Sequence, residues 1–277
     1  FGDAPVNASA VITGDRKLVF TSQNGTLYGF DIRTNVAQTS AKWSTNFGEV
    51  VTKSPAVDAL NNLIIGTESG KVLKIKLNPD GTVTKIWTIS INAEIQSSPV
   101  IDADGYIYIG NKLGDFYKLN PDNGAIVWKY STGAAIKSTP TISDFGSIYI
   151  SNSNGLVTAL TTDKTIKWTY QADGPISANM LYISNMLYIG TETGKFFAIY
   201  DNPNTNTVNT GLSININKNN FTSYNTGSLA SVLQSSIKPE YQYYYESFRN
   251  GAFNFTIGDQ VVKPKKPVWG TFQGNNQ

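Results

Sequence analysis

A tryptophan that returns every 40 to 44 residues is the feature of this 277-residue chain that most constrains its fold. The four members of the series are Trp43, Trp87, Trp128 and Trp168. A glycine recurs with the same period, and a short apolar stretch begins two residues after each one: Gly25, Gly70, Gly114, Gly155 and Gly194. A unit of this length built from short strands is typical of a propeller blade, because each unit is one small sheet that stacks on its neighbours. The sequence therefore predicts an all-β propeller of four-stranded antiparallel blades, with at least five blades visible and the ring size open.

The unit that contains Trp128 illustrates one predicted blade. Its four predicted strands are residues 97–101, 106–110, 116–119 and 125–130. They are separated by turn-forming sequences, and Gly105 can adopt the positive φ that a tight hairpin requires. Asp102 and Asp104 also invite interpretation as calcium ligands, but they stop well short of a full series of oxygen ligands. We therefore expect a hairpin turn at this point, and not a metal site.

The recurrent tryptophans are predicted to be structural. A single four-stranded sheet cannot bury both of its faces, so each blade needs a neighbour on either side. A large indole ring contributes much apolar burial when it packs between two such sheets. We expect Trp43, Trp87, Trp128 and Trp168 to hold adjacent blades together, and not to form a platform for a ligand.

Composition limits the chemistry that this chain can perform. It contains no cysteine and no histidine, which excludes disulfides, thiolate nucleophiles and any triad or zinc site that needs imidazole. Its net charge is +2 and its lysines are scattered, so no basic stripe suggests nucleic-acid binding. No apolar run reaches the roughly 18 residues of a membrane span. Acidic residues such as Asp80 and Asp122 fall at turn positions, so we predict no catalytic residue, no metal ligand and no cofactor-binding residue.

A longer motif runs through the third unit: residues 98–101, 104–110 and 114–120, followed by Gly124 and Trp128. This motif resembles the pyrroloquinoline-quinone-type repeat, which forms the blades of quinoprotein propellers, and five copies cover about residues 10 to 200. The WD40 repeat fits less well, because its Gly-His and Trp-Asp pairs are missing. The dehydrogenases of the quinoprotein family typically carry a vicinal cysteine pair, which this chain lacks. The resemblance thus implies the cofactor-free branch.

The last quarter of the chain departs from the repeat. Residues 201–250 are predicted to form a divergent blade or an insertion, because residues 201–220 contain no counterpart of the tryptophan strand. Residues 251–277 are predicted to be a closing segment, since the stretch from Trp269 is similar to one that precedes the first blade in such propellers. We predict a single propeller domain over residues 1–277. The chain begins at Phe1 directly in blade-like sequence, so we expect it to be processed or cut from a longer precursor.

The resemblance implies a non-enzymatic binding or scaffolding propeller that is secreted, on the cell surface or in the periplasm of a bacterial-type envelope. Catalytically silent members of the family contact protein partners through the propeller rim or the grooves between blades. We therefore expect a protein partner, or a larger surface or envelope assembly. One alternative is a carbohydrate-binding or carbohydrate-active propeller with a glycan ligand, and another is a quinone-dependent dehydrogenase. A third is one module of a large surface or adhesive protein.

An aromatic cluster near the C-terminus is the candidate contact surface for a protein or a glycan. Its members are Tyr241, Tyr243, Tyr244, Tyr245 and Phe248. Tyrosine is favoured in binding patches because it combines area, rigidity and a hydrogen-bonding tip. The competing interpretation is an outer strand whose alternate tyrosines pack on a neighbouring blade.

Overall fold

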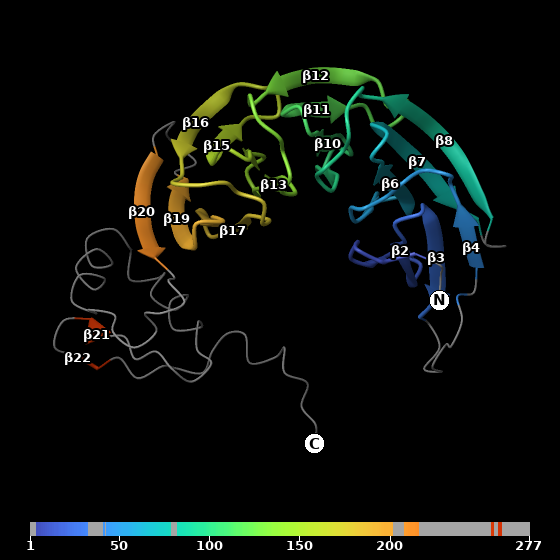
Figure 1. Ribbon diagram of the computed structural model, residues 1–277, viewed down its shortest axis with the longest axis horizontal. Coiled ribbons are helices and arrows are strands. Elements are labelled where there is room, and N and C mark those ends of the chain that lie inside the picture. Colours follow the sequence, from blue (N-terminus) through green and yellow to red (C-terminus); the bar gives the residue numbers. More distant parts are fainter. Residues whose placement is uncertain are drawn as a thin grey trace.

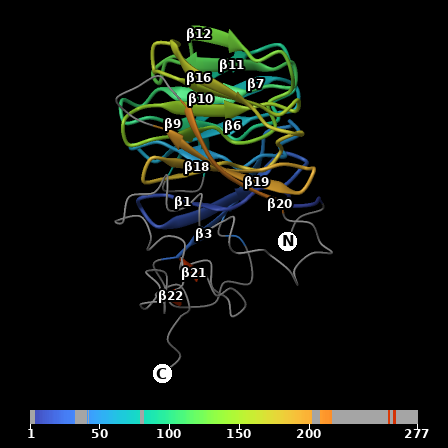
Figure 2. The same cartoon turned by 90° about the vertical axis from the view of Figure 1, so that its left-hand side faces the viewer.

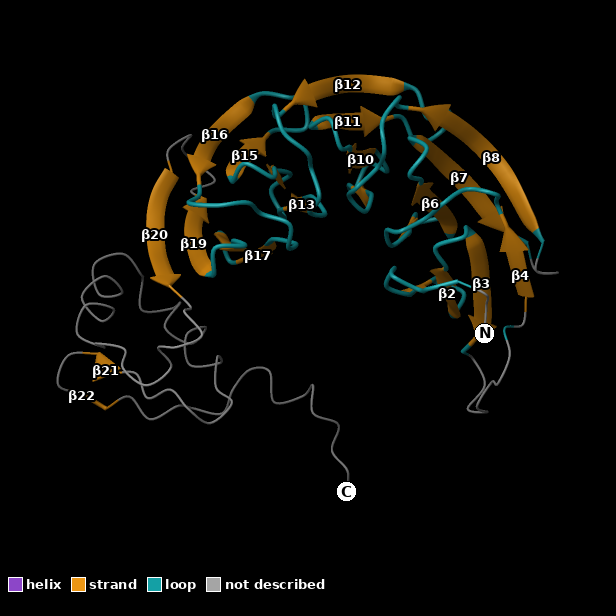
Figure 3. Ribbon diagram, in the orientation of Figure 1, coloured by secondary structure: helices purple, strands orange, loops and turns teal. Residues whose placement is uncertain are grey.

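The computed structural model describes residues 4–32, 41, 43–78, 82–201, 208–215, 256–257 and 260–261. In this part of the chain the regular structure is entirely β, and no helix is present (Figure 3). The strands form five four-stranded antiparallel sheets and one short hairpin. The predicted all-β architecture of four-stranded blades is therefore confirmed.

Each sheet is built from four strands that follow one another along the chain, and we number these blades 1 to 5. Blade 1 contains β1 Val11–Ile12, β2 Lys17–Thr21, β3 Thr26–Asp31 and β4 Trp43–Asn46. Blade 2 contains β5 Ala56–Val57, β6 Asn62–Gly66, β7 Lys71–Leu77 and β8 Val83–Ser90. Blade 3 contains β9 Val100–Ile101, β10 Ile107–Gly110, β11 Asp115–Leu119 and β12 Ile126–Ser131. Blade 4 contains β13 Thr141–Ile142, β14 Ile148–Ser151, β15 Leu156–Leu160 and β16 Ile166–Gln171. Blade 5 contains β17 Leu181–Ile183, β18 Met186–Gly190, β19 Lys195–Asp201 and β20 Val208–Asn215, and the hairpin pairs β21 Thr256–Ile257 with β22 Gln260–Val261.

The first strand of blade 3 is shorter than the sequence predicted. It was expected over residues 97–101, but β9 contains only Val100–Ile101. Pro99 has no N–H to donate to a ladder. The hydroxyl of Ser97 makes the backbone contacts instead, accepting the N–H of Gly110 at 2.8 Å and donating to its carbonyl at 3.1 Å. A side chain thus replaces the ladder at this point.

The fourth strand of blade 5 lies where the sequence showed no counterpart of the tryptophan strand. β20 pairs with β19 from Lys195↔Asn215 to Asp201↔Val208, so it completes the sheet without a tryptophan. The segment 201–250 had been assigned to a divergent blade or an insertion. Ladder hydrogen bonds use backbone groups alone, so the missing indole did not prevent pairing.

The five blades follow one another around an arc (Figure 1). The short first strands lie on its concave side, and β4, β8, β12, β16 and β20 lie along its convex side. Turned by 90°, the blades are seen stacked face to face (Figure 2). The described residues form this arc and do not close it into a ring.

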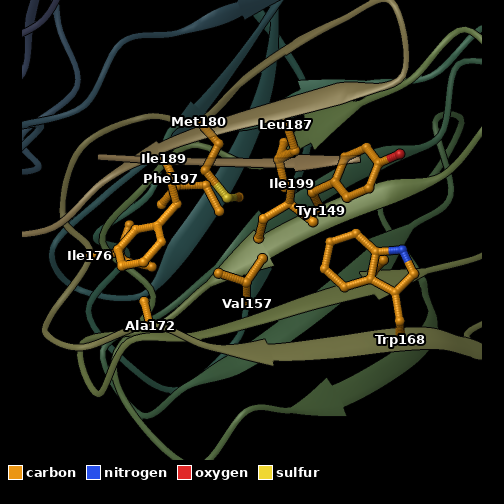
Figure 4. Close-up of a cluster of buried hydrophobic side chains, with 11 residues drawn as sticks. Tyr149, Val157, Trp168, Ala172, Ile176, Met180, Leu187, Ile189, Phe197 and Ile199 are labelled. Atoms are coloured by element: carbon orange, nitrogen blue, oxygen red, sulfur yellow. The ribbon is translucent and has the colours of Figure 1, made fainter. Parts of the chain in front are cut away.

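The hydrophobic core lies between the blades. Four separate clusters of buried side chains each join two successive sheets. The cluster between blades 4 and 5 includes Tyr149, Val157 and Trp168 from one sheet and Leu187 and Ile199 from the other (Figure 4). Each blade therefore depends on its neighbours for burial, as expected of stacked repeats.

The recurrent glycine is required by a close approach of two loops. Gly114 follows β10 with a φ of +85°, which is unfavourable for residues with a side chain. A Cβ atom at this position would lie 2.4 Å from the carbonyl oxygen of Ala134, in the segment that leads to blade 4. Gly155 repeats the arrangement with a φ of +82°. The periodic glycine thus marks a turn that is in close contact with the segment leading to the next blade.

Candidate interaction surface

Trp87 connects blade 2 to blade 3. Its indole Nε1 donates to the carbonyl of Pro121, in the turn between β11 and β12, at 3.0 Å. Lys74 Nζ donates to the same carbonyl at 2.9 Å and forms a salt bridge with Asp58 at 2.9 Å. A Cβ on Gly124 of this turn would lie 2.7 Å from the indole ring, so only glycine fits there. A ring, a cation and a glycine together join the two blades.

Trp128 repeats this contact between blades 3 and 4. Its Nε1 donates to the carbonyl of Thr162 at 3.0 Å, and Lys118 Nζ donates to the same oxygen at 3.1 Å. The ammonium group of Lys118 also lies 4.0 Å from the centre of the Tyr106 ring, within the range of a cation–π interaction. In both boundaries the acceptor is a backbone carbonyl.

Trp168 contacts a side chain instead. Its Nε1 donates to Asp201 Oδ1 at 2.7 Å, and Lys167 Nζ lies 3.1 Å from Asp201 Oδ2. The phenol of Tyr149 donates a further hydrogen bond to this carboxylate. Burial and the hydrogen bond to Asp201 raise the pKa of Tyr149 above its usual range, so the phenol stays protonated as a donor. One buried carboxylate thus receives three donors from blade 4.

The backbone of Trp43 occupies the matching position in blade 1. It pairs with Gly29, four residues after Gly25, as Trp87 pairs with Lys74 four residues after Gly70. All four tryptophans therefore lie at one register position of the fourth strand. The indole contacts of Trp87, Trp128 and Trp168 described above join adjacent blades.

A β-bulge precedes the tryptophan in three of the fourth strands. In β12, Trp128 pairs with Lys118 and Ile126 pairs with Leu119, so Val127 is left out of the ladder. Ile86 in β8 and Lys167 in β16 are left out in the same way. An extra residue of this kind bends a strand and changes where its neighbours point. In β8 and β12 the extra residue is an apolar side chain that is about half exposed.

These outer strands carry the rim patch, which we define as Ile86, Ile126, Val127 and Ile166. The four side chains are 43%, 50%, 49% and 47% exposed. They lie one or two residues before a recurrent tryptophan on β8, β12 and β16, which run along the convex side of the arc (Figure 1). Other exposed apolar residues such as Leu60, Leu113 and Phe145 lie singly on turns, which is ordinary for a protein surface. The rim patch differs because each of three adjacent blades carries a half-exposed apolar residue at one or both of the two positions before its tryptophan.

Several carboxylates of the described residues have structural partners. Asp102 caps the hairpin of blade 3 by accepting the N–H groups of Asp104 and Tyr106 at 3.0 and 2.8 Å, which is the predicted turn. Burial alone would raise the pKa of Asp58, but hydrogen bonds from Asn62 and Lys74 outweigh it and hold that pKa below its usual range. No group of three or more Asp or Glu side chains in the described part could hold a metal ion.

Ion pairs near the segments that connect successive blades also join neighbouring blades. Lys112 lies 2.8 Å from Glu94, and Lys195 lies 2.9 Å from Asp173. A third pair joins Lys71 to Glu49. Each pair joins the segment that leaves one blade to the next blade, either in the turn before its third strand (Lys112) or at the first residue of that strand (Lys71 and Lys195). These charges therefore also stabilise the stacking of the sheets.

The predicted aromatic contact surface, Tyr241, Tyr243, Tyr244, Tyr245 and Phe248, lies outside the described residues. The rim patch was missed by the sequence analysis. The signal was available as the large apolar residues that precede Trp87, Trp128 and Trp168, but the same residues would have suited a buried strand. Only their exposure separates the two possibilities.

Comparisons with known proteins identify a family model and solved structures that this chain resembles. A family model described as outer membrane protein assembly factor BamB matches residues 75–202. This region contains blades 3 and 4 whole, together with parts of blades 2 and 5. No curated protein sequence matches the chain. Residues 75–202 thus match a model of the quinoprotein-like repeat, the repeat that the motif resembles.

Solved structures show the same architecture at low identity. BamB from Moraxella catarrhalis superposes with a TM-score of 0.64 at 16% identity, covering 77% of this chain and 62% of that chain. A chain of the mitotic checkpoint complex gives 0.63 at 11% identity, covering 76% and 65%. The computationally designed Ika8 protein gives 0.60 at 13% identity, covering 77% and 62%. This chain thus spans less than two thirds of each matched structure, and likeness at such identity establishes the fold alone.

The part of the chain that the structure describes has no helix that is long and apolar enough to cross a membrane.

Proposed function

We propose that this propeller is a non-enzymatic scaffold that binds a protein partner through the rim patch. The observation that carries the proposal is the repetition of a half-exposed apolar side chain on the outer strands of three adjacent blades. Burying the exposed half of one such isoleucine is worth about 1 kcal/mol. Four residues acting together, with the strand edges beside them, supply a useful contribution to a specific contact.

The partner that fits this surface presents apolar side chains on an extended segment. β8, β12 and β16 are each the last strand of a sheet, so each has one unpaired edge beside the rim patch. An extended segment can pair with such an edge through backbone hydrogen bonds while its side chains cover the apolar residues. Bulges and lysines often protect edges from unwanted pairing, and both occur here at Val127 and Lys129. The bulge and the lysine therefore limit pairing to a segment whose backbone follows the bend of the outer strand.

The family match supports an envelope setting. The model that matches residues 75–202 carries the description of an outer membrane protein assembly factor. We propose by analogy that this chain works in the periplasm, on the cell surface or outside the cell, in contact with an assembly of proteins. The engagement of Asp58, Asp102 and Asp201 in structural contacts supports a non-enzymatic role.

The test is capture of partners from the native envelope or secreted fraction, followed by mass spectrometry. Ile126→Lys combined with Val127→Lys places two charges in the centre of the rim patch. We expect this variant to lose most of the partner that the native chain retains. Leu113→Lys is the matched control, because Leu113 is 66% exposed but lies on a turn away from the outer strands. Equal capture by the native chain and the double variant would overturn the proposal.

The aromatic cluster remains a predicted second contact. Replacing Tyr243 and Tyr245 with Ala tests it in the same capture experiment. Loss of partner with an unchanged melting temperature would support a contact surface. A large drop in the melting temperature would support the interpretation as a packed outer strand.

A further inference from the structure

A packing rule repeats at each boundary between blades. The second strand ends on a small residue, which we call the seat residue, and the segment leading to the next blade carries a branched apolar residue, which we call the knob residue. A Cβ on Gly66 would lie 2.6 Å from Ile95, and a Cβ on Gly110 would lie 2.5 Å from Ile136. Since real Cβ atoms do not approach other atoms so closely, each glycine is needed to admit its knob residue.

The spacing of the knob residues is constant. In each blade, one residue of the fourth strand pairs with the first residue of the third strand. These residues are Asn46, Ser90, Ser131 and Gln171. The knob residue lies five positions further along the chain, which gives Val51, Ile95, Ile136 and Ile176 in the same order. All four are buried, with 1% or less of their surface exposed. The carbonyl before each one accepts an N–H from the next blade at 2.8 to 2.9 Å. Position, burial and backbone contact thus define the knob residue together.

Blade 5 contains the seat residue but no described knob residue. Gly190 occupies the position of Gly66 and Gly110, yet a Cβ added there would meet no atom of the described residues within 4 Å. Tyr188 and Phe196 on the same face stack at 5.9 Å, as Tyr108 and Phe116 stack at 6.1 Å in blade 3. The blade 3 pair is fully buried beneath blade 4, whereas the blade 5 pair is partly exposed.

Blade 1 shows the opposite end of the same rule. The carbonyl of Pro5 accepts the N–H of Gln23 at 2.8 Å, as the carbonyl of Glu94 accepts that of Lys112. Val6 follows Pro5 and therefore has the position of a knob residue, but its side chain is 50% exposed. Among the described residues, the arc thus begins with a residue at the knob position that has no seat residue and ends with a seat residue that has no knob residue.

We propose that the outer face of blade 5, centred on Gly190, is the binding surface for a further blade, and that residues 216–277 of this chain supply it. The 62 residues after β20 exceed the 40 to 44 residues of one repeat. The constant spacing from Asn215 leads to position 220, and the first apolar residue from there is Phe221. A segment tethered directly to β20 also has a far higher effective concentration at this face than a second molecule has. The inference is independent of the proposed function.

The chain contains no cysteine, so an introduced thiol can report whether the face is covered. Phe196→Cys is the probe: Phe196 pairs with Gly190 across the sheet, and replacing it leaves the glycine that a knob residue needs. Phe116→Cys is the matched covered control, because Phe116 pairs with Gly110 in the same way and is fully buried. Leu113→Cys is the exposed reference. In the full chain we expect F196C to react with a maleimide at least about tenfold more slowly than L113C, as F116C does, because a covered thiol reacts only after local opening.

Two results would overturn the proposal. An F196C thiol as reactive as that of L113C would mean that the face is open. Protection that disappears on dilution, or on replacing Val6 with Lys, would assign the face to a second copy. The double variant F196C/F221C adds an independent measurement, for we expect an intramolecular disulfide by mass spectrometry and none in the matched L113C/F221C control. Equal disulfide formation in both would also contradict the proposal.

Discussion

The middle blades and the end blades use the same residue positions but differ in burial. Every residue of β10 and β14 is buried, whereas burial alternates along β2 and β18. Tyr108, Tyr149 and Tyr188 lie six residues before the recurrent glycine in blades 3, 4 and 5, yet the first two are fully buried and the third is partly exposed. Burial in this protein is therefore a property of the neighbouring blade, and not of the strand itself.

The boundaries between blades also differ in the group that accepts the hydrogen bond of the tryptophan indole. Boundaries 2–3 and 3–4 use a backbone carbonyl as the acceptor of the indole and of a lysine. Boundary 4–5 uses the side chain of Asp201. A backbone carbonyl is present whatever residue carries it, while a carboxylate can be deleted by one substitution. We therefore expect boundary 4–5 to be more sensitive to a single substitution than boundaries 2–3 and 3–4.

The largest expected effect is at this boundary. Asp201→Ala should destabilise the protein by about 3–5 kcal/mol, because it leaves the ammonium of Lys167, whose side chain is only 11% exposed, without its counter-charge. The indole of Trp168 and the phenol of Tyr149 lose their acceptor as well. Urea unfolding measures the loss.

Asp122→Ala is the control, since Asp122 is exposed on the turn of blade 3. Its effect should stay within about 0.5 kcal/mol. Equal losses for the two variants would mean that the Asp201 contacts do not hold blades 4 and 5 together.

The second prediction compares one repeat position in a middle blade and an end blade. Ile109 is fully buried in blade 3, and Phe20 holds the same position on the outer face of blade 1, where it is partly exposed. Ile109→Ala should cost about 2–5 kcal/mol, because it leaves an enclosed cavity. Phe20→Ala should cost less, about 1–2 kcal/mol, since water can fill the space. A larger loss for Phe20→Ala would show that the outer face of blade 1 is covered too.

The third prediction concerns alkaline pH. Burial and the charge of Asp115 raise the pKa of Tyr117 from 10.0 to about 12. A phenol with a raised pKa in the folded state contributes stability that is present below pH 10 and is lost as pH rises toward 12. Tyr117→Phe removes this dependence, so its stability relative to the native chain should rise across that interval. The two hydrogen bonds of the phenol are long, at 3.3 and 3.4 Å, so the substitution should change stability little at neutral pH.

Tyr28→Phe is the matched control for this measurement. Tyr28 lies three residues after Gly25, as Tyr117 lies three after Gly114, but it is on the partly exposed face of blade 1. Urea unfolding of both variants at neutral and alkaline pH makes the comparison. A flat difference between Tyr117→Phe and the native chain across pH 10 to 12 would contradict the prediction.

The smallest effect is expected at the rim patch. Val127→Thr keeps the branched shape of a half-exposed side chain that stands outside the ladder, so stability should change by less than about 0.5 kcal/mol. Thermal unfolding measures it. A drop of several degrees in melting temperature would mean that the outer strands are as constrained as the inner faces, and the contrast between them would be lost.

Much of the fold could be predicted from local sequence. The hairpin at Asp102, the glycine turns and the four strands of blade 3 follow from turn chemistry and strand propensity, which act over a few residues. β20 was missed because the prediction relied on a tryptophan, while strand pairing depends on backbone groups. The rim patch was missed because Ile126 and Val127 have the composition of a buried strand.

The sequence by itself determined the repeat, its period, the number of visible blades and the lack of histidine and cysteine chemistry, because each of these depends on residue identity and spacing. Only the tertiary structure decided which copies of one position are buried, which acceptor each tryptophan finds, and where the pattern is left with a knob residue or a seat residue alone. Those features depend on which residues the facing sheet presents. The sequence of one repeat does not specify the blade that packs against it, so similar repeats can differ in burial.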